Sequence, residues 1–173
     1  MKKLFFIILI IHTLFLISNA QWITQYPYTA AVGLRDIEFI NLNTGWICGD
    51  GIILKTTNRG QNWIIQNNPV PDKLLFSIHP IDSNIVYCAG WFDTLLKTTN
   101  GGNNWYTLLN GIIGQSFCYE ALFFINANTG WFAGTGNYVH KTTNGGISFD
   151  SVYLLGEHKD FHFKDYLIFL KKY

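Results

Sequence analysis

The chain has 173 residues, a formal net charge of +1, 17% aromatic residues and 16 glycines. This length suits one domain better than two, and the near-neutral charge without a basic stripe argues against a nucleic-acid partner. A high content of aromatic residues and glycines is typical of short β-strands joined by tight turns.

The N-terminal segment has the pattern of a secretory signal peptide. Lys2 and Lys3 precede an apolar run from Leu4 to Ile17, and small residues follow at positions 18–20. That run is shorter than the roughly 20 residues that a membrane-spanning helix needs, which favours a signal peptide over an anchor. We therefore expect cleavage of residues 1–20, a lead-in at residues 21–33, and export to a periplasmic, lumenal or extracellular compartment, with no membrane span in the mature chain.

Residues 34–68 have the pattern of a four-stranded antiparallel sheet. We expect strands at 35–40, 44–49, 52–57 and 62–66. Asp50 and Gly51, between the second and third strands, predict a two-residue type I′ turn in which both residues have positive φ.

The corner between the third and fourth strands has its own chemistry, in the stretch Lys55-Thr56-Thr57-Asn58-Arg59-Gly60-Gln61-Asn62-Trp63. We expect the Asn58 side chain to accept hydrogen bonds from backbone amides two residues further on. Gly60 is expected to supply a positive φ, and Trp63 to anchor the next strand with a large apolar side chain.

The same plan returns twice after a connection with Pro69 and Pro71, which can be neither helix nor central strand. The corner stretch begins again at Lys97 and Lys141, at intervals of 42 and 44 residues, a period typical of propeller blades. Strands are expected at 74–79, 84–90, 94–99 and 103–109, and at 120–125, 129–134, 138–143 and 147–153. A second repeat, residues 39–46 with 124–131, supports the same register.

We therefore predict an all-β chain of β-propeller-type four-stranded blades, an incomplete propeller with three complete blades and the start of a fourth. The blades are placed at 34–68, 74–110 and 119–154. Residues 155–173 begin like a further blade and then lose the pattern, so we expect a truncated or aberrant piece of a longer propeller. Open blade faces would allow the chain to associate with itself.

The corner stretch resembles the Asp-box (BNR-type) motif of sialidases and sortilin-like receptors, with Asn in place of Asp. Its structural residues are Thr56, Asn58, Gly60, Trp63, Thr98, Asn100, Gly102, Trp105, Thr142, Asn144, Gly146 and Phe149. The wider pattern, Phe-x-Asn-x-Asn-Thr-Gly-Trp followed by Lys-Thr-Thr-Asn-Gly-Gly, resembles the propeller family of photosystem II assembly and stability factors. That resemblance implies a secreted or lumenal propeller that assists membrane-protein assembly without catalysis.

Three cysteines follow the signal segment, and an odd number does not support a disulfide framework. Cys48 lies one residue before a strand-closing glycine and Cys88 lies two before the next, so they point to opposite faces of their strands. We expect Cys48, Cys88 and Cys118 to be buried free thiols.

A candidate binding face should form where the turns between second and third strands meet the blade-to-blade connections. Its residues are Asp50, Trp91, Phe92, Asp93, Phe117 and Asn137. Exposed aromatic side chains in loops on a rigid scaffold indicate contact with a partner. The alternative is that Trp91 and Phe92 pack between blades, because Trp is buried on average.

Catalytic and metal sites are poorly supported by the sequence. A sialidase needs three arginines around the substrate carboxylate, and this chain has only Arg35 and Arg59. A glycosidase needs a carboxylate pair, for which Asp50, Asp93, Glu120 and Asp150 are available. A metal cluster at Glu157, His158, Asp160 and His162 is disfavoured, because a strand-like alternation would scatter the ligands. His79 and His140 have no visible partner, and no cofactor is expected.

Two functions remain open. The favoured prediction is a non-catalytic, exported propeller that binds or assembles a protein or an extracellular polymer. The alternative is a carbohydrate-active propeller, either a glycosidase or a sugar-binding module, which needs a carboxylate pair or aromatic side chains presented flat to a sugar ring.

Overall fold

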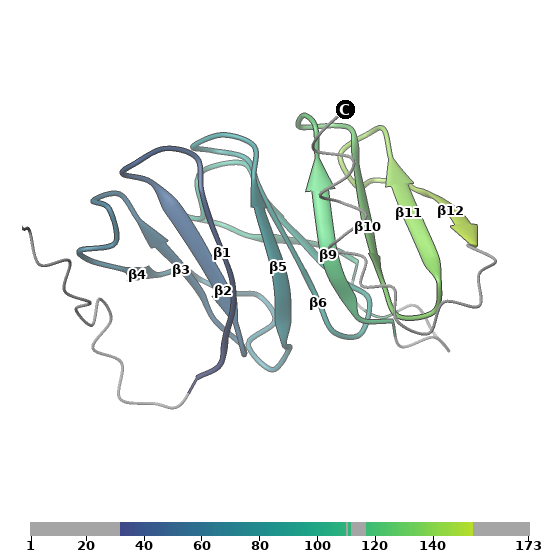
Figure 1. The fold of residues 1–173 in the computed structure, drawn as a ribbon, viewed down its shortest axis with the longest axis horizontal. Helices are drawn as coiled ribbons and strands as arrows, with labels where there is room; N and C mark the ends of the chain where they lie inside the picture. The colour runs from purple at the N-terminus through teal and green to yellow at the C-terminus, as the bar shows by residue number, and fades with distance from the viewer. Residues whose placement is uncertain (1–31, 110, 112–116, 154–173) are drawn as a thin grey trace, which may run out of the picture.

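The computed structural model describes residues 32–109, 111 and 117–153, which form three four-stranded antiparallel sheets (Figure 1). The first blade contains β1 (Leu34–Phe39), β2 (Gly45–Gly49), β3 (Ile53–Thr56) and β4 (Ile64–Ile65). The second contains β5 (Leu75–Pro80), β6 (Val86–Gly90), β7 (Thr94–Thr98) and β8 (Tyr106–Leu109). The third contains β9 (Tyr119–Phe124), β10 (Gly130–Gly134), β11 (Tyr138–Thr142) and β12 (Asp150–Tyr153).

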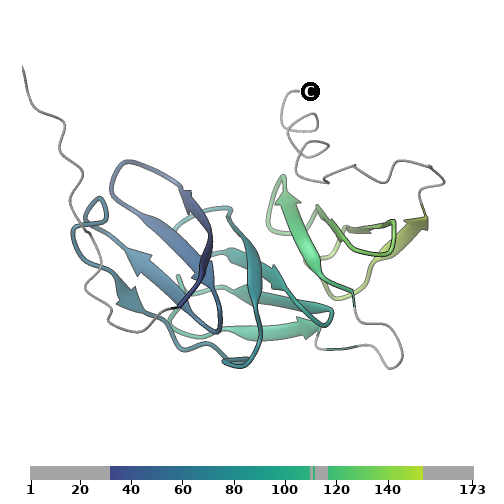
Figure 2. The same ribbon diagram turned by 60° about the horizontal axis from the view of Figure 1, so that its bottom comes forward.

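These sheets confirm the predicted all-β fold with propeller-type blades. Within each blade the strands are hydrogen-bonded in chain order, so that β1, β5 and β9 are the first strands of their sheets. The three blades lie side by side as an open array, and β5 lies between β1 and β9 (Figures 1 and 2). The predicted signal peptide, the start of a fourth blade and the disfavoured metal cluster lie outside the described residues. In the described part of the chain, no helix is long and apolar enough to cross a membrane.

The fourth strands begin later than the sequence analysis expected. They start at Ile64, Tyr106 and Asp150, each directly after the large aromatic residue of the corner stretch. The residues before that aromatic belong to the corner itself, where the Asn side chain accepts a backbone hydrogen bond. The chain therefore turns for two to three residues longer before it can pair as a strand.

Each first strand carries a β-bulge at the same place. In β1 the pairing passes from Leu34–Gly49 to Asp36–Cys48, so that Arg35 has no partner residue. The same shift leaves Phe76 unpaired in β5 and Glu120 unpaired in β9. Because bulges bend a strand and redirect a side chain, these three residues are turned out of the regular alternation.

Most of the core lies between the blades, and a smaller buried cluster of Ile47, Ile52 and Leu54 lies on the first blade alone. One buried cluster joins the first two blades and includes Trp46, Ile53 and Ile78, and a second joins the last two. Equivalent positions show what each blade covers: Ile78 is 1% exposed and Leu122 is 4% exposed, whereas Ile37 in the first blade is 55% exposed. A second blade face is therefore needed to bury this position.

The cysteines of the first two blades meet in the same buried cluster. Cys48 and Cys88 are both fully buried and belong to the core between these blades, and all three cysteines are free thiols. Cys48 points from the first blade toward the second, and Cys88 points from the second blade toward the first. The two thiols therefore face one another. Burial and the neighbouring Cys48 thiol raise the pKa of Cys88, which keeps it in the unreactive thiol form. Cys118 is partly exposed, contrary to the expected burial.

Candidate functional site

The corner stretches are built by the same hydrogen bonds in all three blades. In the second blade the buried Thr98 hydroxyl donates to Asn100 Oδ1 over 3.0 Å and accepts from the backbone N–H groups of Asn100 and Gly102. Gly60, Gly102 and Gly146 have φ values of 80°, 97° and 90°, as expected. The Thr and Asn side chains of the corner use their polar groups for hydrogen bonds within the turn. Their role is therefore structural, and they are not available to bind a ligand.

The Thr and Asn side chains accept different backbone hydrogen bonds from those that the sequence predicted. The amide two residues after the asparagine, which belongs to Gly60 or Gly102, donates to the Thr hydroxyl. The Asn side chain accepts instead from the amide four residues after it. Asn58 Oδ1 accepts from Asn62 N over 2.9 Å, and Asn100 Oδ1 accepts from Asn104 N over 2.9 Å. The Asn therefore reaches across the corner rather than closing a local turn.

The hairpins between second and third strands meet the blade-to-blade connections, as the candidate face required. Asp50 N donates to Gly33 O over 2.8 Å, Trp91 N donates to Leu74 O over 2.8 Å, and Asp93 N donates to Phe117 O over 3.0 Å. These bonds hold every hairpin against the chain segment that enters its own blade or the next. The hairpins and connections thus form one face, which we call the hairpin face.

Asp50 is paired with Arg35, the bulged residue of β1. Arg35 Nε lies 2.8 Å from Asp50 Oδ1, and this hydrogen bond raises the pKa of Arg35. Arg35 also lies 5.5 Å from the centre of the Phe76 ring, at the bulge of the next blade. The predicted type I′ turn is wrong, because Gly51 has a φ of 72° but Asp50 does not have positive φ.

Left-handed hairpin residues occur in the second blade instead. Phe92 and Asp93 have φ values of 52° and 51°, a conformation that costs a side-chain-bearing residue about 1–3 kcal/mol. The Trp91 and Phe92 rings are stacked with centroids 4.7 Å apart, and Lys73 Nζ lies 4.3 Å from the Phe92 ring centre. Trp91 is 38% exposed and Phe92 is 37% exposed, and neither belongs to the buried clusters between the blades.

Asp93 does not belong to the accessible part of this face. Its side chain is fully buried, although the sequence placed it in a solvated hairpin loop. Burial and then the Asp93 charge raise the pKa of Tyr119, and the same charge opposes the lowering of the His140 pKa by burial. Asp93 is therefore a structural carboxylate beneath the hairpin, while Asn137 occupies a left-handed position with φ 60° in the third blade.

Phe117 lies on the connection into the third blade and packs against the hairpin of that blade. Its ring centroid lies 5.6 Å from that of Tyr138, and a Cβ placed on Gly136 would lie against the Phe117 ring. Gly136 is thus needed for the close approach of this loop, and Phe117 serves mainly to hold the hairpin in place.

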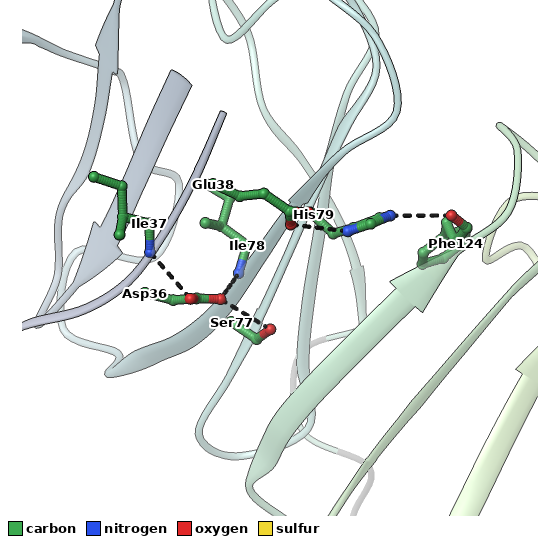
Figure 3. Close-up of polar contacts among 7 residues, drawn as sticks. All are labelled: Asp36, Ile37, Glu38, Ser77, Ile78, His79 and Phe124. Carbon is green, nitrogen blue, oxygen red and sulfur yellow. Dashed lines mark hydrogen bonds and ion pairs between the residues drawn. The ribbon is translucent and has the colours of Figure 1, made fainter. Parts of the chain in front are cut away.

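The first strands of the blades are joined by polar contacts that the sequence analysis missed (Figure 3). Asp36 Oδ2 accepts from Ser77 Oγ over 3.2 Å and from Ile78 N over 3.0 Å. Its other oxygen accepts from Ile37 N over 3.0 Å. A carboxylate of β1 thereby satisfies groups of β5 and ties the first two blades together.

His79 joins all three blades, which corrects the expectation that it has no partner (Figure 3). Its Nδ1 lies 2.9 Å from Glu38 Oε2 in β1, and its Nε2 lies 3.0 Å from the carbonyl oxygen of Phe124 in β9. The His79 ring therefore connects β1 and β9 through its two nitrogens. His140 also has a partner, because its Nδ1 lies 2.7 Å from Ser151 Oγ.

Four carboxylates were considered for a glycosidase, and two of them, Glu120 and Asp150, lie too far apart to act as a pair. Asp93 is buried and Asp50 is bound by Arg35. Glu120 belongs to β9 and Asp150 to β12, at opposite edges of one four-stranded sheet. Three strand spacings of about 4.8 Å place them about 14 Å apart, beyond the roughly 9.5 Å limit of glycosidase pairs. Among the described residues, no group of three or more His, Cys, Asp or Glu side chains could hold a metal ion.

Comparison with solved structures identifies propellers of two kinds. The chain is similar to "YCF48 bound to D1 peptide" (19% identity, TM-score 0.65), with 74% of this chain matching 42% of that one. It is similar to YCF48 from Cyanidioschyzon merolae (20% identity, TM-score 0.61), covering 72% of this chain and 41% of that one. It also matches AFV00434, an ancestral GH74 enzyme (22% identity, TM-score 0.56), with 77% of this chain covering 20% of the enzyme.

No family model and no curated protein matches the sequence. The chain spans less than half the length of the two YCF48 structures. The similarity therefore establishes the propeller fold, in agreement with the predicted assembly-factor-like architecture.

Proposed function

We propose that this chain is an exported, non-catalytic propeller that binds a polypeptide segment on its hairpin face. The observation that carries the proposal is the exposed, stacked pair of Trp91 and Phe92 on a left-handed hairpin. Strained backbone persists where the surroundings over-determine it, and it is concentrated at binding sites. Aromatic side chains of this kind supply most of the energy in protein interfaces.

The surroundings of this pair suit a polypeptide ligand. Lys73 lies over Phe92, and the ion pair of Arg35 with Asp50 lies on the same hairpin face. An aromatic centre with a polar rim is the usual arrangement of a protein interface. One structurally similar propeller was solved with a bound D1 peptide, which supports the choice of a polypeptide over another ligand.

A test of binding uses a phage-displayed library of random peptides as the probe. We expect enriched peptides to bind the wild-type chain and to lose at least tenfold in affinity for a Trp91→Ala, Phe92→Ala variant. A matched control, Leu42→Ala with Ile147→Ala, removes two other exposed apolar side chains, which lie in turns away from the hairpin face. Equal affinity for both double variants would contradict the proposal.

A carbohydrate-active function is the second candidate, because two of the similar structures are GH74 enzymes and an exposed aromatic pair can stack on a sugar ring. The separation of Glu120 from Asp150 weighs against a hydrolase that uses these two carboxylates, and Asp50 is already bound by Arg35. Hydrolysis of aryl glycosides that is lost in both Asp50→Asn and Glu120→Gln would establish the second candidate and refute a non-catalytic role.

Export and self-association complete the proposal. Removal of residues 1–20 would give exported protein a mature N-terminus at Gln21, which mass spectrometry detects, and an intact Met1 would contradict export. Self-association would pair the open face of the first blade, where Ile37 is 55% exposed, with the same face of a second copy.

A further inference from the structure

A lysine from each corner stretch joins one blade to the next. Lys55 Nζ lies 4.9 Å from the centre of the Trp46 ring in its own blade and donates to the carbonyl oxygen of Gly101 in the second blade over 2.8 Å. Burial lowers the pKa of Lys55. The contact repeats one blade later, where Lys97 lies 5.0 Å from the Tyr87 ring and 3.4 Å from the Gly145 carbonyl oxygen.

Glycine occupies the position that the lysine reaches in the next blade. Gly101 and Gly145 have φ values of 70° and 74°. A Cβ on Gly101 would lie 2.7 Å from Lys55 Nζ, and a Cβ on Gly145 would lie 2.7 Å from Lys97 Nζ. Any larger residue would thus push the ammonium group away from the carbonyl that it binds.

Arg59 holds the equivalent position in the first blade. Its backbone N–H donates to Asn43 O over 3.0 Å, as Gly101 donates to Asn84 O and Gly145 to Asn128 O. It keeps the left-handed backbone, with φ 64°, although it is not glycine. Its guanidinium Nε donates to Asn43 Oδ1 over 2.9 Å, so a cation already occupies this corner.

The lysine that ends the series is Lys141, on the open side of the third blade. Its Nζ lies 5.5 Å from the Trp131 ring centre, in the same arrangement as the two earlier pairs. Lys141 is exposed, and within the described ranges its ammonium group has no hydrogen-bond acceptor. Trp46 and Tyr87 are fully buried, whereas Trp131 is half-buried. This side of the blade is therefore built for a contact of the kind that the other two lysines make.

We propose that the Trp131–Lys141 face binds the glycine-containing corner of a further blade, and that Arg59 prevents the first blade of a second copy from occupying it. The two interfaces between the three blades supply the model for the contact, and the arginine supplies the selectivity. A second copy would bring a Cβ and a positive charge against the Lys141 ammonium group. The proposal does not depend on what the hairpin face binds.

The test uses the whole chain and a variant of it as the probe. Arg59→Gly with Lys141→Met offers a glycine corner but has no lysine of its own with which to form longer arrays. We expect this probe to form a one-to-one complex with the wild-type chain, detected as a doubled molar mass by light scattering behind a sizing column. The matched control, Lys141→Met alone, retains Arg59 and should bind at least tenfold more weakly.

A further variant separates the parts of the contact. An Arg59→Ala, Lys141→Met probe lacks the charge but keeps a Cβ, and it should bind more weakly than the glycine probe. Failure of the glycine probe to bind, equal binding by the Arg59 control, or a wild-type chain that already associates through Lys141 would each overturn the proposal.

Discussion

Thr98→Val is predicted to destabilise the second blade strongly, although it changes the shape of the side chain very little. The hydroxyl of Thr98 is fully buried and takes part in three hydrogen bonds within the corner. Losing it leaves the buried Gly102 N–H without a partner, which costs about 1–3 kcal/mol, and each of the other two bonds contributes about 0.5–1.5 kcal/mol. The free energy of unfolding should therefore fall by about 2–6 kcal/mol.

The assay is urea unfolding followed by tryptophan fluorescence, with Trp105 next to the altered corner. Thr99→Val is the matched control, because Thr99 is the adjacent threonine, is exposed, and makes no side-chain hydrogen bond in the part of the chain that the structure describes. A chain of this size loses about 2–4 °C of melting temperature per kcal/mol, so in a parallel thermal melt Thr98→Val should unfold roughly 4–24 °C below the control. Equal stability of the two variants would refute the assignment of the corner hydrogen bonds.

Three further predictions follow from single contacts. Phe92→Gly should change the free energy of unfolding by less than about 1 kcal/mol, because relief of the left-handed strain offsets the lost ring contacts. A loss above about 2 kcal/mol would argue against that strain. Burial lowers the pKa of His140 from 6.5, so the unfolded chain binds more protons below that pH and stability falls with acid. His140→Phe with Ser151→Ala keeps the ring and should reduce the fall in unfolding free energy between pH 7 and pH 5, whereas an unchanged slope would contradict this. Lys55→Met should lower the free energy of unfolding by about 1–2 kcal/mol, because it loses the Gly101 carbonyl and Trp46 ring contacts. Lys141→Met should cost less than about 0.5 kcal/mol in the same urea unfolding assay. Equal losses would exclude a role of Lys55 between blades.

The blade architecture could be predicted because each blade repeats its own local signals. The Thr-Thr-Asn and glycine positions specify a corner, and alternating apolar residues specify strands on either side of it. The repeat could not reveal which side chain satisfies which amide: the Thr hydroxyl and the Asn carbonyl oxygen both accept hydrogen bonds, and their reach depends on the backbone path through the corner. The late start of β4, β8 and β12 has the same cause.

The contacts between blades could not be predicted from the sequence. Glu38 and His79 are 41 residues apart, about one blade period, and occupy equivalent places in β1 and β5. That spacing was the available signal for their pairing, but a lone histidine in a strand gives no indication of a partner until the strands are superposed. Asp93 was misplaced for a related reason, because the hairpin that carries it folds over Tyr119 of the next blade.

The candidate hairpin face was assembled from topology alone, and the structure places its members at one end of the blades. Its accessible part is smaller than the sequence suggested. Asp93 lies beneath the surface, Phe117 supports a loop, and the side chains of Trp91 and Phe92 are left as the exposed aromatic centre. Arg35, Phe76 and Lys73 were missed because bulges and connections, which redirect side chains, do not have a regular sequence period.

Hydroxyl-radical footprinting with and without a selected peptide tests the central claim most directly, namely that the hairpin face binds a polypeptide. Trp91 and Phe92 are both more than a third exposed in the free chain, and the fully buried Trp46 serves as an internal control that stays unoxidised in both samples. We predict that the bound peptide lowers the oxidation rates of Trp91 and Phe92 severalfold and leaves the exposed Ile147, in a corner away from this face, unchanged. Unchanged oxidation of Trp91 and Phe92 in the saturated complex would contradict the account.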